Sequence, residues 1–104
     1  MDTSQRLEIE VRFTPTPSGG RKTSVDLTTG RYRPHLITES GEFLGVVFVQ
    51  STPAVAQPGD TAFAVVALIY PGVDYSALVP GAGFGVVEGS QVVATGKVLV
   101  SKQA

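Results

Sequence analysis

Turn signals that contain proline or glycine recur about every ten residues along this chain. Proline lacks a backbone donor and glycine readily adopts positive φ, so such stretches interrupt regular elements. No window between them shows apolar residues at the spacing of an amphipathic helix. The clearest signals lie at residues 14–20, 29–30, 39–42, 58–60, 71–72, 80–83 and 89–90. This punctuation favours an all-β sandwich or barrel.

The segments between the turns have the composition of β-strands. Apolar Leu7, Ile9, Val11 and Phe13 alternate with charged residues, which predicts a strand with one buried face. Residues 43–49 are apolar and β-branched, which suits a strand buried on both faces. Short strands are expected near 25–27 and 32–36. A hairpin is expected from residues 84–88 through the turn at 89–90 into 91–100.

The segment 61–70 fits a helix or a strand by length, because its alanines tolerate a helix. We predict a strand, since the segment is otherwise rich in β-branched and aromatic residues and Pro-Gly pairs bracket it.

Composition bounds the domain organisation. The chain has 104 residues, of which 42% are hydrophobic and 16% charged, as in a folded globular protein. This is the size of one domain, and we find no repeat or internal boundary, so residues 1–104 are predicted to form a single domain. We expect residues 1–5 and 102–104 to be loose ends.

Neither a targeting signal nor a membrane span is predicted. Residues 1–5 lack the basic and then apolar pattern of a signal peptide. The longest apolar stretch, residues 62–70, is too short to cross a bilayer. We therefore expect a cytoplasmic protein that does not contact membranes.

The residues that most chemistries need are scarce. The chain has no cysteine and one histidine, His35, so a metal site would depend on scattered carboxylates, and we expect no metal or cofactor. No Gly-x-Ser-x-Gly elbow surrounds a serine. The glycines at 19–20 lack the Gly-x-x-x-x-Gly-Lys spacing of a phosphate loop, and those at 81–85 lead into a strand, so no nucleotide site is expected. We predict a protein that is not an enzyme, with His35 as a surface or turn residue.

Positive charge is concentrated in one segment. Between residues 21 and 33 there is a single acid, Asp26, and there are four bases: Arg21, Lys22, Arg31 and Arg33. The whole chain, in contrast, carries a net charge of −1. If residues 21–35 share a face, that face could bind a phosphate backbone or an acidic protein, with Tyr32 stacking on a base. Composition alone favours the simpler interpretation, a solvated basic loop.

Five segments in order resemble the C-terminal β-barrel, or third domain, of elongation factor Tu. Gly-Gly-Arg-Lys-Thr at 19–23 is similar to the family's Gly-Gly-Arg-His-Thr, and Tyr-Arg-Pro at 32–34 to its Tyr-Arg-Pro-Gln. The segment at 55–60 resembles the family's segment that ends in Pro-Gly-Asp. The segment at 68–71 resembles the family's Leu-Ile-x-Pro. Residues 84–96 resemble the closing hairpin without a gap. The resemblance implies a small six-stranded antiparallel β-barrel of the translation-factor type.

The resemblance also implies a function in translation. The family's barrel helps hold tRNA and contacts protein partners, so Arg21, Lys22, Arg33 and His35 become candidate phosphate or ribose contacts. Gly89 would allow close backbone approach. Two departures weaken RNA binding, because Val87 and Gln91 stand where the family has arginines. The family's GTPase domain is also absent.

Three functions remain open. The chain could be a binding module for tRNA or another RNA, or for a translation component, through residues 21–35. It could instead be a protein-interaction module without RNA binding, such as a mimic or adaptor for partners of elongation factor Tu or a toxin-neutralising protein. A small-molecule site in the barrel mouth is disfavoured, because a small barrel is filled by its own side chains.

Overall fold

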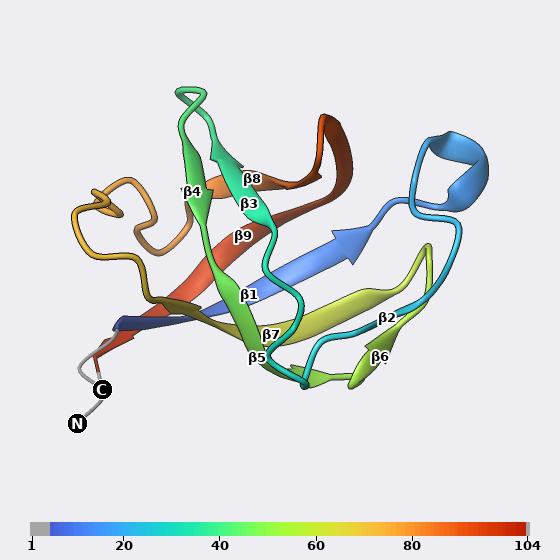
Figure 1. Ribbon diagram of the computed structural model, residues 1–104, viewed down its shortest axis with the longest axis horizontal. Coiled ribbons are helices and arrows are strands. Elements are labelled where there is room, and N and C mark those ends of the chain that lie inside the picture. Colours follow the sequence, from blue (N-terminus) through green and yellow to red (C-terminus); the bar gives the residue numbers. More distant parts are fainter. Residues whose placement is uncertain (1–4, 104) are drawn as a thin grey trace.

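The computed structural model describes residues 5–103, with side chains for residues 5–101, and these form an all-β fold (Figure 1). The strands are β1 (Gln5–Phe13), β2 (Val25–Asp26), β3 (His35–Thr38), β4 (Phe43–Gly45), β5 (Val47–Thr52), β6 (Val55–Ala56), β7 (Thr61–Leu68), β8 (Gly83–Glu88) and β9 (Gln91–Gln103). Within the described residues the helical structure is one 3-10 turn, η1 (Thr16–Ser18).

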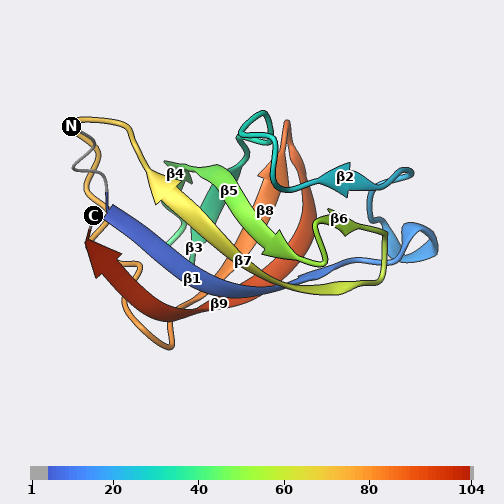
Figure 2. The ribbon, with the colours of Figure 1, turned by 90° about the horizontal axis from the view of Figure 1, so that it is seen from below.

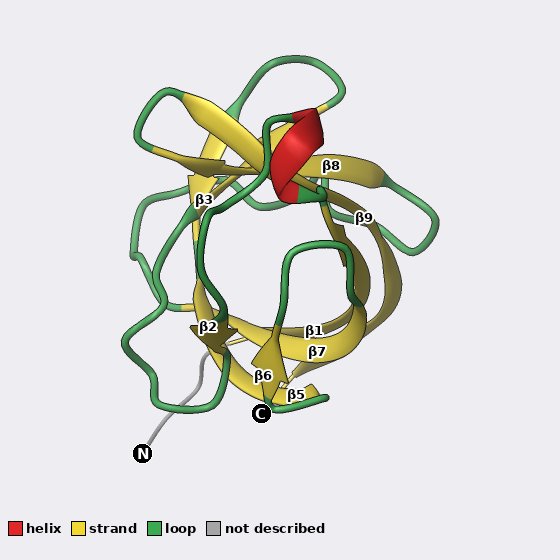
Figure 3. Ribbon diagram, turned by 90° about the vertical axis from the view of Figure 1, so that its right-hand side faces the viewer, coloured by secondary structure: helices red, strands yellow, loops and turns green. Residues whose placement is uncertain are grey.

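Seven strands form one antiparallel sheet in the order β4-β3-β8-β9-β1-β7-β5, and β2 pairs with β6 in a small second sheet. The large sheet curls into a half-barrel, so that strands and loops surround a common interior (Figure 3). The two short strands β2 and β6 lie at one end of the molecule, beyond the hairpin of β3 and β4 (Figure 2).

The core fills the concave side of the curled sheet. On β1, which lies between β7 and β9, the residues Leu7, Ile9 and Val11 are fully buried. Inward residues of β1 and of the other strands join them in one cluster, which includes Phe13, Leu36, Phe48, Val66, Val86 and Val98. Burial of this apolar surface is the main stabilisation available to a sheet of this size.

Most strand predictions are confirmed. The alternating segment forms β1, the alanine-rich segment 61–70 forms the strand β7 over residues 61–68, and Gly89 and Ser90 connect β8 and β9 as a hairpin. The pattern at 61–68 decides against a helix because Ala62, Ala64 and Val66 alternate with more exposed residues.

The expected six-stranded barrel is confirmed only as an all-β, barrel-like fold, because the large sheet is a half-barrel of seven strands. One cause is that the predicted strand at 43–49 is divided at Val46. β4 pairs with β3, whereas β5 pairs with β7 at the other end of the strand order. At the division the backbone N–H of Val46 donates to the Pro34 carbonyl at 3.2 Å, and the backbone N–H of Phe48 donates to the Tyr32 carbonyl at 3.0 Å. The segment is buried on both faces only around this bend, since Phe43 is 59% exposed.

The chain ends also differ from expectation. Gln5 pairs with Gln103 and Arg6 with Lys102, so three of the expected loose residues, Gln5, Lys102 and Gln103, belong to strands. Long pairing of β1 with β9 explains this, because each added residue continues an existing ladder. The rest of the expected loose ends, residues 1–4 and 104, lie outside the described part. Among the described residues, no helix is long and apolar enough to cross a membrane.

Gly96 marks the tightest contact between the closing strands. A Cβ atom there would lie 2.3 Å from the Glu10 carbonyl oxygen and 2.8 Å from the Phe84 ring. No real Cβ contact is that short, so only glycine permits β1, β8 and β9 to approach as they do.

We predict that Gly96→Ala lowers the free energy of unfolding by about 3 kcal/mol or more, because the backbone of β1 and the buried Phe84 ring would both have to move. The matched control is Gly83→Ala, whose added Cβ would meet its nearest atom at 3.8 Å. It should change stability by less than about 1 kcal/mol. Urea unfolding of both variants tests this, and equal losses would contradict it.

Candidate binding site

Four of the six predicted site residues meet at one shallow hollow. It encloses about 240 Å³ between the segment before β3 and the hairpin of β8 and β9. The predicted residues in its wall are Tyr32, Arg33, His35 and Gly89. Pro34, Val87 and Glu88 complete the lining. Of the basic segment 21–35, residues 32–35 line the hollow.

Glu88 is the centre of a hydrogen-bonded cluster at this hollow. The guanidinium of Arg21 forms an ion pair with the Glu88 carboxylate, and the Tyr32 hydroxyl donates to the same carboxylate oxygen. The guanidinium carbon also lies 5.7 Å from the centre of the Tyr32 ring. The side chains of Arg21 and Glu88 are only 20% and 30% exposed, so water screens the pair incompletely. Arg21 is therefore already neutralised within the chain.

Tyr32 is held on both sides. Its ring centre lies 5.2 Å from that of the buried Phe48, with the planes tilted by 50°. Burial of the ring raises the pKa of the Tyr32 hydroxyl well above its usual value, and the hydrogen bond and negative charge of Glu88 add to the shift. The hydroxyl therefore stays protonated as a donor to Glu88. A nucleotide that stacked on Tyr32 would have to displace Phe48 or the Arg21 guanidinium from this ring.

The loop before β2 positions Arg21 by tight local contacts. A Cβ at Gly20 would lie 1.8 Å from the Thr14 carbonyl oxygen, so glycine is required where the loop folds back. The Thr16 hydroxyl donates to the Arg21 carbonyl at 2.6 Å, and the Gln91 amide donates to the Gly19 carbonyl. Gln91, which stands where the resemblance expects an arginine, therefore anchors this loop to β9.

The remaining cations face solvent. Lys22, Arg31 and Arg33 are exposed, and one guanidinium N–H of Arg33 donates to the Gly30 carbonyl at 3.2 Å. Asp26, the acid of this segment, accepts hydrogen bonds from the hydroxyl and amide of Thr28, which lower the pKa of its carboxyl group. These contacts occupy Asp26 locally. His35 is an exposed residue of β3, as predicted for a surface residue.

An uncharged surface continues from the hollow across β3, β4, β8 and β9. Ile37 pairs with Phe43 on one side and with Gly85 on the other. A Cβ at Gly85 would lie 3.0 Å from Ile37 and 3.2 Å from Val92, so these two side chains converge over the glycine. Phe43 and Val92 are 59% and 47% exposed.

Successive residues around β3 point alternately toward the core and toward solvent. Pro34, Leu36 and Thr38 are buried, whereas the outward row is Arg33, His35, Ile37 and Glu39. We call this row, together with Phe43 and Val92, the β3 face. Sequence analysis missed Glu88, Ile37, Phe43 and Val92 as site residues. The sequence pattern predicts Phe43 in a strand buried on both faces and Glu88 at the end of the strand 84–88, and neither position indicates a site.

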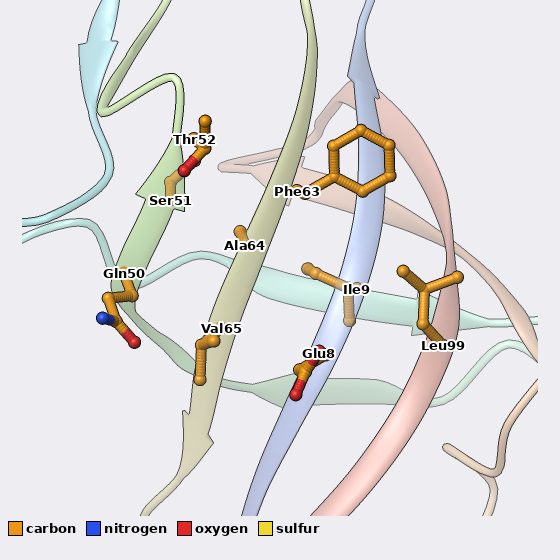
Figure 4. A pocket seen from close by; sticks show the side chains of 9 residues that line it. All are labelled: Glu8, Ile9, Gln50, Ser51, Thr52, Phe63, Ala64, Val65 and Leu99. Atoms are coloured by element: carbon orange, nitrogen blue, oxygen red, sulfur yellow. The ribbon is translucent and has the colours of Figure 1, made fainter.

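A second hollow lies elsewhere, on the outer surface of β5, β7, β1 and β9, and encloses about 270 Å³. Phe63 and Leu99 stand on one side of it, and Gln50 and its neighbours on β5 stand on the other (Figure 4). It contains none of the predicted site residues.

Comparison with models of known protein families and with curated protein sequences found no match for this chain. Among the residues that the structure describes, no three His, Asp or Glu side chains lie close enough together to hold a metal ion.

We predict that Tyr32→Phe flattens the loss of stability at alkaline pH. The pKa of Tyr32 is raised in the folded protein. The hydroxyl therefore contributes fully to the free energy of unfolding below its pKa in the unfolded chain, about 10, and this contribution is lost as the pH rises above that value. Tyr70 and Tyr75 remain in both proteins and provide the common background. Urea unfolding at intervals from pH 7 to the alkaline limit measures the difference, and parallel profiles would contradict the assignment.

Neighbouring cations should behave differently. Arg21→Ala should lower the free energy of unfolding by about 1 to 2 kcal/mol, because it leaves the partly buried Glu88 carboxylate without its ion pair. Lys22→Ala, the matched control in the same loop, should change stability by less than about 0.5 kcal/mol. Thermal or urea unfolding at neutral pH measures both effects. Equal losses of stability for the two substitutions would contradict a structural role of Arg21.

Proposed function

We propose that this chain is a non-catalytic binding module that docks a protein through the β3 face. The Glu88 carboxylate carries the proposal. It lies in the hollow where the predicted site residues meet, and it engages Arg21, the first of the predicted phosphate contacts. A fixed carboxylate repels phosphate, and an arginine that is already paired cannot release much free energy by binding it.

The composition of the β3 face supports the same choice. Its centre carries the exposed apolar side chains of Phe43 and Val92, with Ile37 between them. Protein interfaces combine such an apolar centre with a polar rim, and aromatic residues are enriched in them. Here Arg33 and His35 lie at one end of β3, and Glu39 lies at the other. An RNA backbone would meet that acid at unfavourable cost.

The resemblance to the third domain of elongation factor Tu supports a role in translation. That barrel contacts protein partners as well as tRNA, so an isolated domain of this type would serve as an adaptor or mimic for such partners. Val87 in place of an arginine agrees with this proposal, because it removes a cation that phosphate binding would use.

RNA binding is the second candidate, and one observation favours it. Lys22, Arg31 and Arg33 are exposed, and Asp26 is occupied by Thr28. Three cations on one loop system could contact phosphates without Arg21. Such binding would fall steeply with salt, because each phosphate contact releases counterions.

A pull-down from cell lysate with and without RNase separates the two candidates. We expect a defined protein to be recovered after RNase treatment and to be retained by the Lys22→Ala/Arg31→Ala variant. Phe43→Ser should reduce recovery roughly tenfold or more, because it removes an exposed aromatic contact.

Phe63→Ser is the matched control, since Phe63 is 55% exposed on a different surface. It should leave recovery unchanged. Recovery of tRNA that disappears with RNase and with Lys22→Ala/Arg31→Ala would instead establish RNA binding and overturn the protein proposal.

A further inference from the structure

The outward row of β3 carries opposite charges at its two ends. Arg33 precedes β3 and Glu39 follows it, and the two outward residues between them are His35 and Ile37. Six residue steps separate positions 33 and 39, a span of at most about 20 Å. The Glu39 carboxyl carbon would lie 3.9 Å from a Cβ placed on Gly83, so this acid sits over the end of β8.

Such a row is complementary to its own reversed copy. Consider two copies of the chain related by a two-fold axis that crosses β3 between His35 and Ile37. The start of the row in one copy then lies opposite the end of the row in the other copy. Arg33 of each copy then faces Glu39 of the other, so one operation forms two ion pairs. Two-fold dimers use the same patch on both molecules, which requires this kind of symmetry in the charge pattern.

The apolar residues obey the same operation. Phe43 is level with Ile37, and Gly45 is level with His35, because these are the pairs in the ladder of β3 and β4. The Tyr70 ring covers Gly45, since a Cβ there would lie 2.8 Å from the ring. Reversal therefore places Phe43 of one copy against Tyr70 of the other. Tyr70 is 39% exposed, so both rings are available.

The other charged row in the large sheet lacks this property. The outward residues of β1 are Arg6, Glu8, Glu10 and Arg12. Reversal about the centre of that row would place arginine against arginine and glutamate against glutamate, which is unfavourable. Of the two rows, only the β3 row is complementary to itself about its own centre.

We infer that a second copy of this chain docks on the β3 face, in an antiparallel two-fold arrangement with Arg33 opposite Glu39. The inference rests on the proposed function, because it names the protein partner of the same face. Lys22 and Arg31 are not used in the contact.

Charge reversal tests the arrangement, with sedimentation velocity over a roughly fiftyfold range of protein concentration as the measurement. Arg33→Glu and Glu39→Arg should each weaken dimerisation roughly tenfold or more, because each places like charges together at both ends. The double variant should restore dimerisation to within roughly threefold of the unchanged chain. Arg12→Glu, on the outer row of β1, is the control and should have no effect.

Mixing the two single variants gives the sharpest result. A copy with glutamate at 33 and 39 complements a copy with arginine at both places, so two weakly associating proteins should form a heterodimer. No association in the mixture, or a double variant no better than the singles, would overturn the inference.

The two proposals fail separately. Suppose that the unchanged chain sediments as a monomer at every concentration, while Phe43→Ser still reduces recovery of a protein from lysate. The inference of a second copy is then wrong, and the proposal of the β3 face as a docking surface stands. If Phe43→Ser changes neither sedimentation nor recovery, both are wrong.

Discussion

Burial of one row of side chains on β1 is the constraint on which the rest of this structure depends. Leu7, Ile9 and Val11 are fully buried, and β1 pairs along its length with β7 and with β9. Since successive residues of a strand face opposite sides, this burial forces the intervening charged residues outward. The sheet must then curl so that β7 and β9 can place their own apolar residues over the same row. The tight approach at Gly96 is a consequence of this curl.

The cluster around Glu88 connects the periphery to that sheet. It joins Arg21, from the loop before β2, to Tyr32, from the segment before β3, at the end of β8. Tyr32 in turn contacts Phe48 in the core. A carboxylate with two donors in a partly buried setting fixes relative position more than it adds stability, because its desolvation offsets much of the attraction. The residues that resemble an RNA site are, in this fold, partly structural.

This division of roles separates the candidate functions. A cation with an internal ion pair contributes little to phosphate binding, whereas exposed apolar side chains lose unfavourable contact with water when a protein covers them. The β3 face combines such side chains with opposite charges at its ends. The order of its charges is a physical reason to propose a second copy of the chain as the occupant.

Local pattern alone determined the all-β class, the alternation of β1, the strand at 61–68 and the hairpin at Gly89. These depend on interactions between residues close in the sequence, on turn geometry and on period-two burial. Tertiary structure decided the rest. The division at Val46 arises because neighbouring parts of one segment pair with strands at opposite ends of the sheet. The pairing of Arg21 with Glu88 joins residues 67 positions apart, and the convergence of Ile37 and Val92 joins strands β3 and β9 across Gly85. No local pattern encodes such contacts, because they exist only once the curled sheet has brought the strands together.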